Sequence, residues 1–237
     1  MGYISVRNAH KEFMKDGEPL TILEDINLDI EKGEFICLLG PSGSGKSTLL
    51  NAMAGFELVT SGSITIDGEE VKAPQLRYVT VFQNYGLLPW RTVESNIDPA
   101  IIDKYVKMVG LDHARNRYPA ELSGGMQQRV SIARALAVDP DIIFMDEPLG
   151  ALDALTRINL QDEISRICRE EGKTVVFVTH DIEEAVVLAD RVVVLAAKPT
   201  AHRHPLLIFE TISLNNSNWQ KKTKSSSIFS CIYLGIL

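Results

Sequence analysis

The sequence predicts an α/β fold in which helices cover both faces of a parallel sheet. Short, continuously apolar segments suit strands buried on both faces: 35–39, 77–82, 142–145, 175–178 and 192–195. Segments with helical spacing alternate with them: 46–54, 101–109, 126–138, 152–171 and 182–188. A glycine-rich loop joins the first of these strands directly to the first helix. This alternation is typical of strands that run parallel in one sheet.

The amino-terminal part of the chain is expected to be rich in strands. Residues 3–35 read as short strands joined by turns, and Asp16-Gly17 is a hairpin-type turn. A further strand and turn is expected at 63–68. In the longest helix, 152–171, four apolar positions are expected to face inward: Leu155, Ile158, Ile164 and Ile167.

Composition is ordinary for a soluble globular protein and limits the choice of partner. Of 237 residues, 45% are hydrophobic and 23% are charged, enough for one large domain or two small ones with a sizeable core. The formal net charge is −7. This acidic balance argues against nucleic acid as the main partner, because phosphate binding usually leaves a basic footprint.

Cysteine usage and hydropathy favour a cytoplasmic location. Cys37, Cys168 and Cys231 lie far apart, which fits a reducing compartment and argues against a disulfide scaffold or a zinc site. The start of the chain has no signal-peptide pattern, and no apolar run approaches the roughly 18 residues that span a bilayer. A membrane role would therefore have to come through a partner.

The strongest motif lies in the glycine-rich loop and fits the pattern G-x-x-x-x-G-K-[ST]. Its residues are Gly40, Pro41, Ser42, Gly43, Ser44, Gly45, Lys46, Ser47 and Thr48. Between a strand and a helix, such a loop turns backbone N–H groups toward phosphate oxygens, and the helix N-terminus favours an anion. Lys46 would reach the β and γ phosphates, and Ser47 would ligate Mg²⁺. The alternative is a plain glycine-rich turn.

Two acidic residues, Asp146 and Glu147, follow directly on an apolar strand. Acidic groups there are expensive unless they meet a cation or a polar ligand. In a sheet with a phosphate-binding loop, Asp146 would hold Mg²⁺ and Glu147 would act as general base toward the attacking water. The alternative is a solvated strand end before a turn at Pro148.

A second candidate anion site is the stretch Leu122-Ser123-Gly124-Gly125 at the start of a predicted helix. It presents a hydroxyl and backbone N–H groups at a helix N-terminus, which suits a phosphate. The alternative is a helix cap followed by a flexible turn, and nothing in the residues alone assigns this site to the same nucleotide.

Taken together, these motifs resemble the ATP-binding-cassette (ABC) family in order and spacing over nearly all of residues 3–197. The resemblance implies a P-loop NTPase with a RecA-like core, a small antiparallel β part and a helical subdomain inserted at about 84–140. It also implies a head-to-tail dimer of two ATPase subunits, with each ATP held between one P-loop and the partner's signature. The signature residues here are Ser123, Gly124, Gly125 and Gln127.

Four further roles follow from the same resemblance. Gln83 would contact Mg²⁺ or the water and report occupancy to the helical subdomain. His180 would touch the γ-phosphate, although a lone histidine after a strand is more often structural. Asp153 would shape the dimer interface. Phe13 would stack on adenine, with a core phenylalanine as the alternative.

The loop 84–93 resembles that of importer ATPases of the nitrate, sulfonate, taurine and bicarbonate group, and 157–168 leans toward the nitrate/bicarbonate branch. An exposed Leu-Pro-Trp loop is unusual unless something covers it. The resemblance implies integral membrane permease subunits as partners, and indirectly a solute-binding protein, at the cytoplasmic face of the bacterial inner membrane. We expect Leu88 and Trp90 to line the groove for the permease's coupling helix.

Two regions depart from the family pattern. Between Asn96 and Tyr105 the chain is short, because the family has an additional helical stretch there, so the helical subdomain is expected to be reduced. Residues 198–237 carry five Lys/Arg and one Asp/Glu and show no period. We interpret them as a poorly ordered tail that is separate from the domain 1–197. We expect a shifted reading frame or a truncated end to have produced this tail, and the alternative is natural divergence.

Two other functions remain open from the sequence. One is a soluble, non-transport ABC ATPase of DNA repair, chromosome maintenance or translation, which the acidic balance and the lack of coiled coils or basic arms disfavour. The other is a degenerate relative that binds ATP as a regulatory switch, against which Glu147 and His180 argue.

Overall fold

One mixed sheet runs through the computed structural model, which describes residues 2–82, 85–97, 102–150, 152–197 and 206–213. Among these residues the strand order is β5-β4-β1-β2-β10-β9-β3-β8-β7-β6. The strands are β1 (Ile4–Lys15), β2 (Glu18–Ile30), β3 (Phe35–Leu39), β4 (Ser61–Ile66), β5 (Glu69–Glu70), β6 (Tyr78–Val81), β7 (Ile142–Asp146), β8 (Thr174–Thr179), β9 (Arg191–Ala197) and β10 (Leu206–Ser213). The α-helices are α1 (Lys46–Ala54), α2 (Val93–Asn96), α3 (Ile102–Met108), α4 (Gly124–Ala137), α5 (Ala154–Glu170) and α6 (Ile182–Leu188).

The predicted parallel sheet is confirmed in strands β9, β3, β8, β7 and β6, which pair in parallel. Their side chains alternate between two cores. Phe35 and Cys37 of β3 pack in a core with α4, α5 and α6, whereas Ile36 and Leu38 pack with α1 and the β1–β2 region. Burial on both faces is why these strands read as continuous apolar runs.

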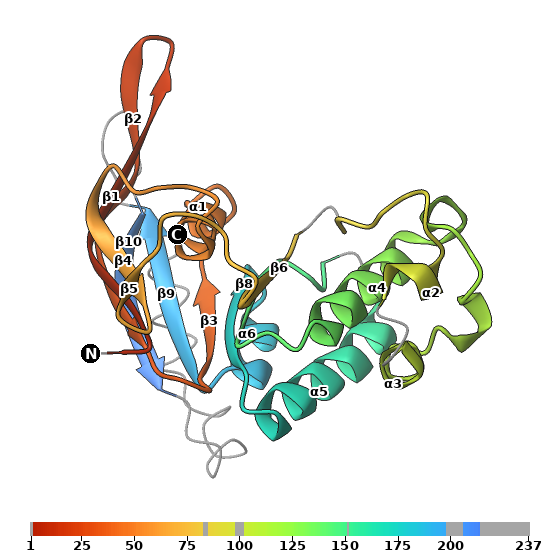
Figure 1. Cartoon of the computed structure of the whole chain (residues 1–237). Helices are drawn as coiled ribbons and strands as arrows, with labels where there is room; N and C mark the ends of the chain where they lie inside the picture. Colours follow the sequence, from red (N-terminus) through yellow and green to blue (C-terminus); the bar gives the residue numbers. More distant parts are fainter. Residues whose placement is uncertain (1, 83–84, 98–101, 151, 198–205, 214–237) are drawn as a thin grey trace.

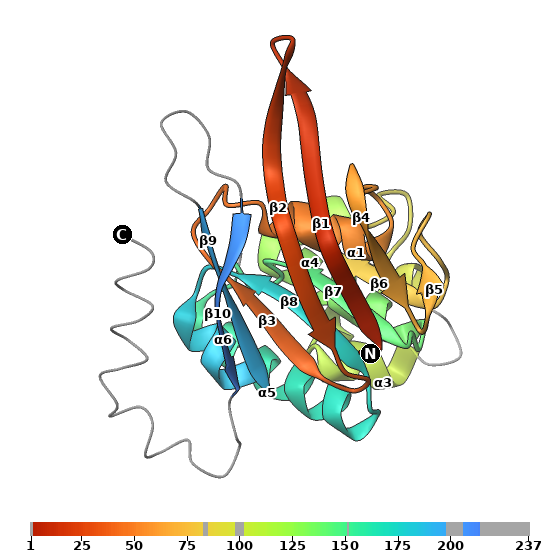
Figure 2. The ribbon, with the colours of Figure 1, turned by 90° about the vertical axis from the view of Figure 1, so that its left-hand side faces the viewer.

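The amino-terminal strands are longer than the sequence indicates. Instead of several short strands, β1 and β2 are 12 and 13 residues long and pair as one antiparallel hairpin. Asp16 (φ 53°) and Gly17 (φ 82°) make the predicted turn, since a two-residue hairpin turn needs positive φ at both positions. The hairpin projects well beyond the rest of the molecule (Figures 1 and 2).

Between β6 and β7 the chain forms α2, α3, two short 3₁₀ helices (Asp112–Ala114 and Pro119–Glu121) and α4. Helices α2, α3 and α4 lie together to one side of the sheet (Figure 1), within the range expected for the helical subdomain. Tyr105 and Val106 of α3 are buried in the same core as Val130 of α4. Helix α2 has only four residues, and 98–101, within the stretch expected to be short, lie outside the described residues.

Part of the tail belongs to the sheet, although the sequence indicated no regular element after Ala197. Strand β10 pairs antiparallel with β9 from Leu206↔Ala197 to Ser213↔Arg191, and it meets β2 at Leu206↔Leu23. It therefore joins the parallel strands to the antiparallel ones. The sequence did not indicate this strand because backbone hydrogen bonds pair it with its neighbours, and such pairing does not require a hydrophobic period in the sequence.

Helix α5 presents a different face to the core from the one predicted. Ile164 and Ile167 are buried as expected, but Leu155 and Ile158 are 71% and 54% exposed. The inner face is instead completed by Leu160 and Cys168. With 3.6 residues per turn, Leu155 lies about 180° around the helix from Ile164. The expectation of inward positions at Leu155 and Ile158 was therefore wrong.

Two isoleucines on α5 test this orientation. Ile164→Ala should cost about 2–5 kcal/mol of unfolding free energy, because it leaves a cavity in the core. The matched control Ile158→Ala should change it by less than about 0.5 kcal/mol. Thermal and urea unfolding measure both, and a larger loss for Ile158→Ala than for Ile164→Ala would show that the helix is turned the other way.

Candidate functional site

The glycine-rich loop connects the end of β3 to the start of α1, as predicted. Gly43 and Gly45 have φ angles of 77° and 99°, which side chains other than glycine rarely adopt. At Gly40 a Cβ would lie 2.5 Å from the carbonyl oxygen of Leu195 on β9. The loop therefore owes its shape to glycine at these three positions.

Lys46 is the buried cation at the centre of this loop. Its side chain is 3% exposed, and Nζ donates to the carbonyl oxygens of Gly40 (2.9 Å) and Pro41 (2.7 Å). Burial lowers the pKa of Lys46, while the nearby carboxylates of Glu147 and Asp146 act in the opposite direction. The buried Ser44 hydroxyl has no hydrogen-bond partner among the described residues. An anionic ligand would satisfy both groups, so the loop fits the phosphates of a nucleotide.

Ser47 and Asp146 meet at the ends of neighbouring elements, α1 and β7. The Ser47 hydroxyl donates to Asp146 Oδ1 at 3.0 Å. Burial raises the pKa of Asp146, partly offset by this hydrogen bond. Hydroxyl and carboxylate oxygens are ligands that Mg²⁺ prefers, and a cation would offset the cost of a negative charge on the half-buried Asp146. The third predicted metal ligand, Gln83, lies outside the described residues.

Glu147 and His180 stand together just beyond the ends of β7 and β8. Glu147 Oε2 lies 3.3 Å from His180 Nδ1. The Glu147 backbone has a positive φ of 46°, and its N–H donates to the Val178 carbonyl at 3.0 Å. A non-glycine residue with positive φ is strained and held by its surroundings. The side chains border a small cleft of about 90 Å³ that also reaches Gly150.

The signature residues cap α4 and lie apart from the glycine-rich loop. Ser123 Oγ accepts from the Met126 N–H at 3.3 Å, and Gln127 Nε2 donates to the Leu122 carbonyl at 3.2 Å. A Cβ at Gly124 would lie 2.8 Å from the Tyr85 hydroxyl oxygen, so the Tyr85 side chain lies close to the start of α4. In Figure 1, α4 lies on the other side of β6 from α1.

Asp153 lies just before α5, and Phe13 lies on the long hairpin strand β1. Asp153 caps α5, because its Oδ1 accepts from the Thr156 N–H at 3.0 Å, and this bond lowers the pKa of Asp153. Phe13 lies on β1, is 38% exposed, and has Lys11 Nζ 4.7 Å from its ring centroid. Phe13 is therefore not a core residue, and part of its ring remains open to a ligand.

Three residues were not predicted from the sequence as site residues: Arg157, Thr179 and Glu184. They line the same cleft as Glu147 and His180. Glu184 on α6 is 5% exposed. A buried carboxylate is uncommon, but this burial is visible only in the structure.

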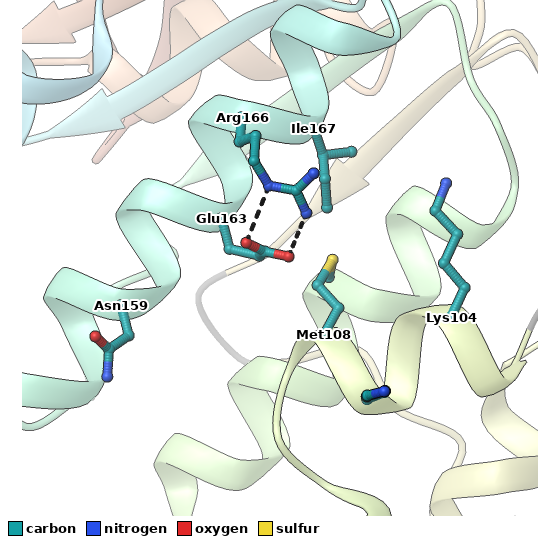
Figure 3. Close-up of a pocket in the computed structure, with 7 residues that line it drawn as sticks. Lys104, Met108, Asn159, Glu163, Arg166 and Ile167 are labelled. Carbon is teal, nitrogen blue, oxygen red and sulfur yellow. Dashed lines mark hydrogen bonds and ion pairs between the residues drawn. The ribbon is translucent and has the colours of Figure 1, made fainter.

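A separate hollow of about 480 Å³ lies between α3 and α5 (Figure 3). Arg166 pairs with Glu163 at 2.6 Å, and Lys104 pairs with Glu171 at 2.6 Å. Because these charges are already compensated within the protein, the hollow gives a phosphate less reason to bind than the glycine-rich loop does.

These features define the class of protein as a P-loop nucleotide-binding protein with an inserted helical portion. The family model described as "ABC transporter" matches residues 23–150. The chain therefore belongs to the ABC transporter family.

Solved structures agree with this assignment. A dimeric ATP-binding cassette, MJ0796, in a post-hydrolysis state bound to ADP and Pi, superposes with a TM-score of 0.78. It is 32% identical, and the match covers 90% of this chain and 99% of that one.

Several curated relatives are ATP-binding proteins of importers. The bicarbonate transport ATP-binding protein CmpC of Synechocystis sp. is 48% identical over 83% of this chain, and the chain spans 32% of its length. The nitrate import protein NrtD of Synechococcus elongatus is 43% identical over 84% of this chain and 78% of its own length. The aliphatic sulfonates import protein SsuB of Bacillus licheniformis is 47% identical over 83% and 81%. In the part of the chain that the structure describes, no helix is long and apolar enough to cross a membrane.

The raised pKa of Asp146 makes a testable prediction about stability. A carboxyl with a higher pKa in the folded protein than in the unfolded chain contributes stability at low pH, which is lost as pH rises through the folded pKa. At pH 7 the charged carboxylate of Asp146 therefore opposes folding. Without nucleotide or metal, Asp146→Asn should raise the melting temperature at pH 7, and the gain should shrink toward pH 4.

The exposed residue Asp162 on α5 provides the control for this comparison. Asp162→Asn should leave the melting temperature unchanged at both pH values. A loss of stability in Asp146→Asn at pH 7 would contradict the assignment of a costly, half-buried charge to Asp146.

Proposed function

We propose that this chain binds and hydrolyses ATP to energise a membrane importer. The observation that carries the proposal is the cluster at the carboxyl ends of β3, β7 and β8. There a buried lysine, a paired hydroxyl and carboxylate, and a glutamate–histidine pair surround one glycine-rich loop. Backbone N–H groups of residues 40–48 would hold the phosphates, and Lys46 would exchange its carbonyl partners for phosphate oxygens.

The residues of the cluster divide the chemistry between them. Ser47 and Asp146, with Gln83, would hold Mg²⁺, which neutralises phosphate charge when bound. Glu147 would accept the proton of the attacking water, and its contact with His180 supports a shared location. His180 would contact the γ-phosphate, and Phe13 would stack on the adenine.

A second subunit would complete each site. Ser123 and Gly125 lie at the start of α4, away from the glycine-rich loop of the same chain, so a partner's signature would have to supply the contacts to that nucleotide. Gly124, Gln127 and Asp153 would belong to the same interface. The dimeric state of the similar cassette MJ0796 supports this arrangement.

The transported solute is proposed to be a small anion of the nitrate, bicarbonate or sulfonate class, because relatives with those names are 43–48% identical to this chain over the matched residues. The chain would lie on the cytoplasmic face of the membrane, bound to permease subunits that a solute-binding protein serves. Trp90 is 71% exposed and Leu88 is half-buried beside it, so this loop offers apolar surface to a permease helix.

Glu147→Gln tests the hydrolytic role. It should bind ATP with wild-type affinity and lower kcat by about 10²-fold or more, because the amide cannot accept the proton. Steady-state ATPase assays and nucleotide titration measure both quantities. Unchanged turnover would remove Glu147 from the reaction. Binding without turnover in the wild type would favour a regulatory ATP switch.

Trp90→Glu tests the permease surface. It should leave ATP binding intact and abolish co-purification with the co-expressed permease subunits, because a carboxylate opposes burial in an apolar interface. The control is Leu58→Glu, an equally drastic change at a residue 54% exposed after α1. Retention of the permease by Trp90→Glu, or its loss in both variants, would count against the loop as the docking surface.

A further inference from the structure

The buried carboxylate of Glu184 contacts the loop that carries His180. Glu184 of α6 is 5% exposed, and its Oε2 accepts from the Thr179 hydroxyl at 2.6 Å. The Thr179 hydroxyl in turn accepts from the Asp181 backbone N–H at 3.0 Å. These bonds bridge the two sides of His180, the residue between Thr179 and Asp181. The loop that carries the imidazole is therefore held by the Glu184 carboxylate.

Arg157 is the cation that faces this carboxylate from α5. Its Nε lies 3.6 Å from Glu184 Oε1, and its Nη1 lies 3.9 Å from Asp181 Oδ2. Its Nη2 donates to the backbone carbonyl of Leu152 at 3.1 Å. Leu152 immediately precedes Asp153, so one guanidinium contacts both the segment before α5 and the loop of His180.

Resting on the function proposed above, we infer that Arg157 is a positioning residue for hydrolysis. Through Glu184 it fixes the place of His180, and through Leu152 it ties that place to the segment around Asp153. The planar guanidinium suits this task, because it donates to the Leu152 carbonyl while lying within ion-pair distance of Glu184 and Asp181.

The contacts of Arg157 predict an effect on turnover rather than on binding. Among the described residues, the guanidinium pairs with Leu152, Asp181 and Glu184, none of which belongs to the glycine-rich loop, so ATP should still bind when it is removed. A displacement of catalytic groups by about 1 Å can cost 10²-fold in rate. Loss of Arg157 should therefore lower kcat and leave KM for ATP nearly unchanged.

The experiment compares Arg157→Gln, Glu184→Gln and the double variant in steady-state ATPase assays of the full chain. Each single change should lower kcat by about tenfold or more, with KM within about twofold. The double variant should be no slower than the worse single one, because both act through one contact. Arg157→Lys, which keeps a cation near Glu184, should recover part of the lost rate.

Arg166→Gln is the matched control, since Arg166 lies on the same helix but pairs with Glu163 and Glu170 on an exposed face. Its kcat should stay within about twofold of the wild type. The inference is overturned if Arg157→Gln keeps wild-type kcat, if the two losses multiply in the double variant, or if KM rises in proportion. Glu147→Gln separates the two claims: if it is inactive while Arg157→Gln is not, only the positioning role fails.

Discussion

The structure depends on the convergence of parallel strands at one edge of the sheet. Strands β3, β7 and β8 end side by side, and each is followed by a polar or charged segment. Lys46 is buried there and Asp146 is half-buried, and an isolated charge is costly where solvent access is reduced. The two pKa shifts, lower for the lysine and higher for the carboxyl, show that the protein groups alone do not fully offset this cost. A ligand carrying anionic oxygens and a metal cation would do so.

The chain has two portions, the sheet and the helices inserted between β6 and β7. The strands that carry the cluster belong to the sheet, whereas α2 and α4 lie to one side of it (Figure 1). Arg134 of α4 donates to the Gly86 carbonyl at 2.7 Å, so the signature helix and this loop are physically joined. A movement of the helical portion would therefore shift the loop and the signature together, which suits a subunit that transmits a conformational change to a partner.

Features set by a short stretch of sequence were predictable. The glycine-rich loop, the acidic strand end at Asp146 and the turn at Asp16 each depend on residue types within a few positions. The inner face of α5 was not predictable from the sequence. Leu155 and Ile158 are apolar but exposed, because the packing of Ile164 and its neighbours sets the orientation of the helix. The contact of Arg157 with Glu184 joins two helices, and β10 is held by backbone pairing, so neither leaves a local pattern.

The central claim is that the strand-end cluster binds MgATP, and titration calorimetry of the wild type beside Lys46→Ala tests it most directly. The account predicts that the wild type binds ATP more tightly with Mg²⁺ than without it, and that Lys46→Ala loses most of this affinity while remaining folded. Equal affinity in the two proteins, or binding that ignores Mg²⁺, would contradict the account and move the nucleotide site elsewhere.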